Sequence, residues 1–190
     1  MQDVSSQSPQ PDRLAQWIAD EERLWGKQPT DAVPAPISHA QLASKNGLEV
    51  MQAMLRGELP APPIARTLDF VLIEVAYGRA VFQGKPGFAH YNPLGSVHGG
   101  WFATLLDSAL GCAVHTMMPP GRAYTTAELG INMVRALTDK VGRVRAEAKV
   151  IHCGRQLATA EARLVGPDGT LYAHGTTTCL VFEMPATPRG

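Results

Sequence analysis

Residues 99–116 read GGWFATLLDSALGCAVHT, an apolar stretch that contains one acidic side chain. Apolar residues cover nearly every face of a helix built from it, which is typical of a helix buried inside a domain. Asp107 lies in the middle, although aspartate is a poor helix former and a buried charge is costly. The stretch therefore predicts a buried helix, from about His98 to His115, that carries an unusual carboxylate.

The face of this helix around Asp107 is made of small residues, which are Gly100, Ala103, Thr104 and Gly111. Small side chains let a ligand or another chain approach a helix closely. The plain alternative is that Asp107 caps or bridges a neighbouring group, or meets solvent at a gap in the packing.

The predicted helix begins with His98, Gly99 and Gly100. The first amides of a helix have no partner inside the helix, and together with the helix dipole they favour negative charge. Two glycines leave these amides open to a ligand, although Gly-Gly before a helix is also a common loop. An anion site two turns before a carboxylate suits acyl transfer, because the amides stabilise an oxyanion while the carboxylate attacks a carbonyl or activates water.

Strand-like segments flank the helix on both sides. They cover residues 67–76 and 78–84 before it, and residues 125–134, 142–153, 155–165 and 171–184 after it. In 142–153 charged and apolar residues alternate, which predicts one wet face and one packed face. The order of elements predicts an α+β domain with a long central helix against an antiparallel sheet of five to six strands. This architecture is called the hotdog fold.

The N-terminal part differs in character, and we predict two regions, a helical extension with Pro-rich linkers over 1–62 and the hotdog domain over 63–186. Apolar residues at helical spacing predict one helix in 13–25. Ser38 with Gln41 forms a plausible capping box for a second helix, which runs to about Arg56 and stops at Gly57. The extension is too acidic around 20–22 to read DNA.

The bulk composition narrows the classes of function. The chain has 190 residues, 45% of them hydrophobic, and 17 basic residues balance 17 acidic ones. This balance gives no reason to expect nucleic acid or a membrane as a partner. No apolar run approaches the roughly 20 residues of a membrane span, and the start lacks a secretory pattern. Three widely spaced cysteines indicate free thiols and a cytoplasmic location, and no metal-ligand spacing is evident.

The sequence between about Leu68 and Phe182 resembles the PaaI-type hotdog acyl-CoA thioesterases. The likeness rests on HYNPLGSVHGG at 90–100, with an aspartate nine residues after its second histidine, and on GRAVF, TTAEL, VRAE, HCGRQLATAEARL and DGTLYAHGTTTCLVF. The resemblance implies hydrolysis of acyl-CoA, with coenzyme A as part of the substrate and no separate cofactor. It also implies a homodimer or homotetramer with active sites at the subunit interface.

The resemblance assigns the central roles to the helix and its start. Asp107 is implied as the general base or nucleophile. The Gly99 amide is implied as the group that holds the thioester oxygen, with Gly100 keeping the loop open.

Three supporting residues follow from the same likeness. Asn92 is implied to orient the substrate or the attacking water, and His98 to shape the turn and bond near the thioester. Thr126 matches a position where the family places a hydroxyl that faces the aspartate from the partner subunit, although Thr125 is an alternative. Each also has a structural interpretation, because Asn92 is a good turn residue, His98 can serve packing alone and a strand threonine is often structural.

Coenzyme A carries phosphate groups. A protein without net positive charge needs a few basic side chains at defined positions to bind them. Arg135 ends one strand, and Gly154 with Arg155 begins a turn that the resemblance favours as a nucleotide contact. Either arginine can instead be a solvated strand end.

Two other functions fit the same fold. An enoyl-thioester hydratase usually pairs an acid with a catalytic histidine, and no histidine is obviously partnered to Asp107. A non-catalytic acyl-CoA-binding protein is the other alternative. The sequence leaves the acyl group open.

Overall fold

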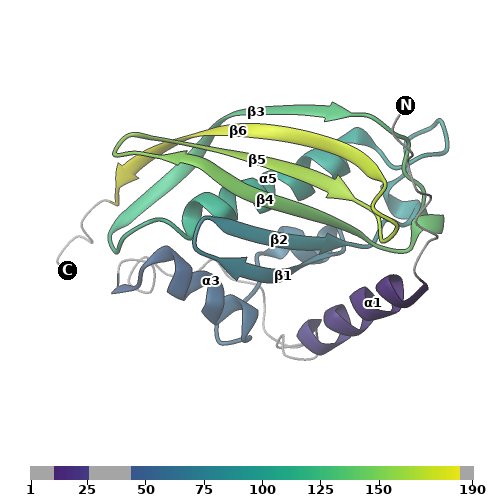
Figure 1. Cartoon of the computed structure of the whole chain (residues 1–190), viewed down its shortest axis with the longest axis horizontal. Coiled ribbons are helices and arrows are strands. Elements are labelled where there is room, and N and C mark those ends of the chain that lie inside the picture. Colours follow the sequence, from purple (N-terminus) through teal and green to yellow (C-terminus); the bar gives the residue numbers. More distant parts are fainter. Residues whose placement is uncertain (1–10, 26–43, 185–190) are drawn as a thin grey trace, which may run out of the picture.

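The computed structural model describes residues 11–25 and 44–184. Figure 1 shows a long helix, α5 (Gly99–His115), lying against a curved antiparallel sheet. The six strands are β1 (Phe70–Ala76), β2 (Arg79–Gly84), β3 (Arg122–Met133), β4 (Val144–Cys153), β5 (Leu157–Val165) and β6 (Leu171–Glu183). Their order in the sheet is β1-β2-β4-β5-β6-β3, so β1 and β3 are its edges. The predicted hotdog architecture is confirmed.

The ends of the predicted elements agree closely with the structure. The helix begins at Gly99 with His98 as its N-cap, and β3 begins three residues before the predicted position. Short helices occupy the connections, namely α4 (Pro63–Thr67) and the 3-10 helices Phe88–His90 and Asp139–Val141. None of the helices within 11–25 and 44–184 combines the length and apolar character that a bilayer crossing requires.

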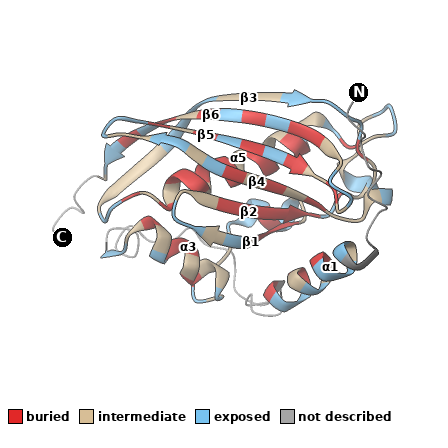
Figure 2. Ribbon diagram, in the orientation of Figure 1, coloured by how far each residue is buried: buried red, intermediate tan, exposed pale blue. Residues whose placement is uncertain are grey.

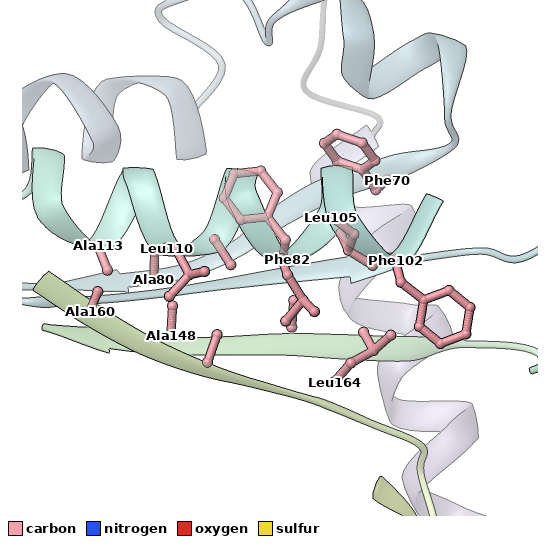
Figure 3. Close-up of a cluster of buried hydrophobic side chains, with 14 of the residues drawn as sticks. Phe70, Ala80, Phe82, Phe102, Leu105, Leu110, Ala113, Ala148, Ala160 and Leu164 are labelled. Atoms are coloured by element: carbon pink, nitrogen blue, oxygen red, sulfur yellow. The ribbon is translucent and has the colours of Figure 1, made fainter. Parts of the chain in front are cut away.

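The core lies between α5 and the inner face of the sheet. Leu105 and Leu110 of the helix are fully buried there (Figure 3). The strands meet them largely with alanines, such as Ala148 on β4 and Ala160 on β5. Because alanine is small, the helix lies close to the sheet while its larger leucines and phenylalanines fill the space between them. This packing fixes the position of α5 and therefore of Asp107.

The N-terminal helix α1 (Pro11–Trp25) packs onto the outer face of the sheet, and the side of it that faces the sheet is buried (Figure 2). The Arg143 Nε donates to Glu21 at 2.5 Å, and Arg145 donates to Asp20 at 2.9 Å. The guanidinium of Arg145 also stacks over Trp17, 4.4 Å from the ring centroid.

These contacts correct the expectation of a wet face along 142–153. The first half of that face is covered by α1, whose acidic residues supply the countercharges, whereas Lys149 further along is exposed. The alternation of charged and apolar residues was therefore interpreted correctly for the packed face. The charged face, however, consists of buried ion pairs with α1 in its first half and of solvated side chains further along.

The second helix of the extension, α3 (Gly47–Leu55), docks on the C-terminal end of α5. Asn46 and Glu49 form its capping box, with both bonds at 2.9 Å. The predicted box at Ser38 and Gln41 lies outside the described residues. The expectation of one continuous helix up to Arg56 is wrong, because residues 45–46 are not helical and Asn46 caps a new helix. The predicted stop is confirmed, because Gly57 follows the helix with a positive φ of 78° that glycine adopts readily.

Candidate active site

The start of α5 places one free amide next to the positive end of the helix dipole. His98 caps the helix, because its Nδ1 accepts a hydrogen bond from the Gly100 amide at 2.9 Å. That bond gives His98 the turn-shaping role the sequence predicted. It also occupies the Gly100 amide, whereas the Gly99 amide has no hydrogen-bond partner within the described part of the chain. Gly99 is therefore the available donor for an anion.

The surroundings of Gly99 explain why a glycine stands there. A Cβ atom at this position would lie 2.9 Å from the Sδ and Cε atoms of Met133 on β3. The Met133 side chain is half exposed, so a flexible thioether lies over the helix start. A ligand can displace such a side chain more easily than it can displace backbone.

Asp107 has a hydroxyl partner inside its own chain. The Oγ1 of Thr126, on β3, donates to the Oδ1 of Asp107 at 3.1 Å. The structure thus selects Thr126 over Thr125. It also corrects the expectation that this hydroxyl comes from a partner subunit, since β3 is the edge strand beside α5. Within residues 11–25 and 44–184, the other carboxylate oxygen of Asp107 has no hydrogen-bond partner.

The small residues around Asp107 have more than one cause. A Cβ atom on Gly111 would lie 2.8 Å from the hydroxyl oxygen of Tyr124, so this glycine makes room for a residue of the same chain. Thr104 bonds back to the Gly100 carbonyl at 2.9 Å, as threonines in helices often do. Gly111 is therefore explained by packing within one chain. The small residues around Asp107 are for this reason weaker evidence of contact with a second chain.

Asn92 lies in a tight loop that uses its side chain. Its Oδ1 accepts from the amides of Leu94 at 2.9 Å and Ser96 at 3.3 Å, and its Nδ2 donates to the Ser96 hydroxyl at 3.1 Å. These bonds support the turn interpretation that the sequence left open. A direct contact between Asn92 and a substrate stays a prediction.

Gly99 and Asp107 are too far apart to act on one carbonyl within a single chain. Eight residues separate them on α5, which corresponds to about 12 Å along the axis at ~1.5 Å per residue. A carbonyl oxygen bound at about 3 Å from the amide leaves a gap of several ångströms between its carbon and the carboxylate of the same chain.

The predicted nucleotide contacts lie at opposite ends of the sheet. Arg135 follows the end of β3, and the neighbouring Leu137 carbonyl accepts from the Val97 amide at 2.9 Å, just before the helix start. Arg155 lies at the other end, where its carbonyl accepts a hydrogen bond from Arg122 at the beginning of β3. The 12 residues of β3 span about 40 Å at ~3.3 Å per residue. Arg135 and the Gly154–Arg155 turn are therefore separate predicted contacts.

A groove beside Asp107 was not predicted from the sequence. It has a volume of about 430 Å³, and its lining includes Thr126, the hydroxyl partner of Asp107. Its walls come from three elements, with Val50, Met51 and Met54 on α3, Cys112 and His115 on α5, and residues 123–126 on β3. The sequence offered no signal for it, because α3 and β3 are far apart along the chain.

The ionisable groups of this groove are held neutral at pH 7. Burial raises the pKa of the Cys112 thiol to about 12 and lowers the pKa of His115. Burial likewise raises the pKa of Tyr124 well above its usual value. Cys112 is therefore no thiolate nucleophile, and the groove presents an uncharged surface next to the carboxylate.

A larger hollow of about 570 Å³ lies on the outer face of the sheet. Its lining is rich in charge, and includes Arg79, Glu147, Lys149, Glu161 and Arg163. The sheet separates this hollow from α5, which carries Asp107 on the other face. It is therefore a poor candidate for the reaction.

Comparison with known proteins identifies the family to which the chain belongs. A family model described as the Thioesterase superfamily matches residues 94–173. The matched segment contains Gly99, Asp107 and Thr126, whereas α1 and α3 lie outside it. A "putative esterase" of Halobacterium salinarum is 38% identical over 82 residues, which are 43% of this chain and 54% of that protein. The chain thus matches about half the length of this curated relative.

Three solved structures match over almost their whole length. The TT0310 protein from Thermus thermophilus is 30% identical, with 63% of this chain and 97% of that chain covered and a TM-score of 0.58. The phenylacetic acid degradation protein PaaI from the same organism, in a mutant form, is 29% identical, with 62% and 97% covered and a TM-score of 0.57. A phenylacetic acid degradation-related protein from Ralstonia eutropha JMP134 is 30% identical, with 68% and 98% covered and a TM-score of 0.63. The chain therefore belongs to the thioesterase superfamily, as a hotdog-fold member of the PaaI type.

Proposed function

We propose that the protein hydrolyses acyl-CoA thioesters to a free acid and coenzyme A. The observation that carries this proposal is the carboxylate of Asp107, held by the Thr126 hydroxyl on a helix whose first amide, at Gly99, is free within the described part of the chain. A thioester needs a donor for the oxygen that becomes negative and a base or nucleophile for its carbon. The helix supplies both kinds of group.

The active unit that we propose is a pair of chains, either as a homodimer or within a homotetramer. Asp107 of one copy then faces Gly99 of the second copy, which removes the separation of about 12 Å along one helix. The edge strand β3 lies next to both groups and presents unpaired backbone on its outer side. A symmetric pairing that places the two helices side by side creates two equal sites.

In this site the thioester oxygen accepts a hydrogen bond from the Gly99 amide and lies at the positive end of the dipole. In one route Asp107 removes a proton from water, and the water oxygen attacks the carbonyl carbon. In the other, the carboxylate attacks directly, and water then hydrolyses the anhydride. Both routes break the C–S bond, and the sulfur leaves as the thiol of coenzyme A once it has gained a proton. Thr126 holds one carboxylate oxygen in either route, so the other one reacts.

The direct test is release of free thiol from a panel of acyl-CoAs that spans short, medium and long fatty acyl groups and phenylacetyl and hydroxybenzoyl groups. We expect thiol release at a rate proportional to enzyme concentration for at least one of them. Tight binding of acyl-CoA without thiol release would contradict hydrolysis and favour the non-catalytic binding function. Hydration of an enoyl-CoA without thiol release would favour a hydratase.

A further inference from the structure

We infer that the groove beside Asp107 holds the acyl group and that α3 forms the wall that limits its length. This inference rests on the proposed function, because the lining of the groove includes Thr126, whose hydroxyl contacts the reacting carboxylate. From there it follows the C-terminal half of α5, on the side of Asp107 away from Gly99. α3 lies at the end of the molecule where β3 begins (Figure 1).

The lining has the chemistry of an acyl site and lacks that of a nucleotide site. The α3 wall is built from Val50, Met51 and Met54, which are aliphatic or thioether side chains. Methionine adapts its shape to an apolar chain, so this wall can contact acyl groups of several shapes. No lysine or arginine lines the groove among the described residues, and a nucleotide phosphate therefore finds no cation there.

The wall is firmly attached to the domain that carries Asp107. The Gly47 amide at the start of α3 donates to the Met118 carbonyl at 2.8 Å. A Cβ atom on Gly47 would lie 1.6 Å from the carbonyl oxygen of His115, so only glycine permits this close approach to the end of α5. α3 therefore has a defined position against α5, as a wall that limits acyl length requires.

The groove has the size of a small-molecule site. Its volume of about 430 Å³ lies within the range of such sites. Because α3 forms one wall of it, we expect an acyl group that is too long for this space to meet that wall and to react more slowly.

The test compares kcat/KM across fatty acyl-CoAs of increasing length for the parent and three variants. Met54→Ala removes part of the α3 wall, and we expect it to raise kcat/KM for acyl groups longer than the parent's optimum, by about tenfold per methylene that gains contact. Ala123→Leu narrows the opposite side of the groove and is expected to shift the optimum to shorter chains.

Leu55→Ala is the matched control. Leu55 is the neighbour of Met54 on α3 and is also half-buried, but it faces the adjacent cavity instead of the groove. Its truncation is expected to lower the melting temperature as Met54→Ala does while leaving the chain-length profile in place. An unchanged profile in both Met54→Ala and Ala123→Leu, with thiol release intact, would overturn the assignment of the groove. Absence of thiol release from the parent with every acyl-CoA would instead contradict the proposed function itself.

Discussion

Replacement of Asp107 by asparagine is expected to lower kcat for thioester hydrolysis by about 10²–10⁴-fold. The amide oxygen of asparagine still accepts the Thr126 hydroxyl, so the local geometry is kept while the negative charge is lost. An amide neither removes a proton from water nor attacks a thioester. The measurement is kcat from thiol release, with substrate binding followed separately by calorimetry.

Folding is expected to survive this substitution. Asparagine has nearly the same size as aspartate and keeps the bond to Thr126, so the melting temperature should stay close to that of the parent. Ser108→Ala is the control on the next residue, where the side chain bonds only the Thr104 carbonyl at 2.8 Å. Its activity should match the parent. If Asp107→Asn turned over acyl-CoA at the parental rate, Asp107 would not be the base or nucleophile.

The second large effect is expected at Gly99, where proline removes the amide hydrogen without breaking the helix. Proline is favoured at the first position of a helix, and the preceding His98 already has the extended backbone that a following proline requires, with φ −63° and ψ 138°. Loss of one oxyanion donor typically lowers kcat by about 10²–10³-fold. We expect Gly99→Pro to fall in this range, as measured by thiol release under saturating substrate.

The Gly99→Ala variant distinguishes the effect of losing the amide hydrogen from the effect of an added Cβ atom. Both variants place a Cβ atom against Met133, whose flexible side chain must move, but only alanine keeps the N–H group. We therefore expect Gly99→Ala to retain most of the parental kcat. Equal losses in the two variants would show that steric contact with Met133, and not the amide, determines activity.

The elements that form the core were predictable because local patterns determine them. The helix of residues 99–115 was marked by its apolar content and by the His-Gly-Gly start, where His98 proved to be the N-cap. The alternation in 142–153 gave the inner face of β4 correctly, since Val144, Ala146 and Ala148 are buried. It misjudged the outer face, because the sequence does not reveal that α1 covers Arg143 and Arg145 with partners more than a hundred residues away.

The candidate site was predictable in its residue types but not in its contacts. Asp107 and Gly99 follow from the helix and its start. Whether Thr126 or Thr125 contacts Asp107 depends on which of the two side chains faces α5. Thr126 does so, next to a bulge in β3 where the register shifts between Thr126 and Glu128. The role of His98 in occupying the Gly100 amide depends on a rotamer, and a sequence does not specify rotamers.

The pairing of Asp107 of one chain with Gly99 of another is tested most directly by complementation. Two differently tagged chains, one with Asp107→Asn and one with Gly99→Pro, are co-expressed, and the mixed assemblies are purified through both tags. Each mixed dimer contains one site with an intact Asp107 and an intact Gly99 and one site that lacks both, so thiol release should recover to about half of the parental rate. Each variant alone, tagged and purified the same way, provides the baseline. If the mixed assemblies stay as inactive as either variant, the two groups do not act together across a pair of chains, and the proposed site is wrong.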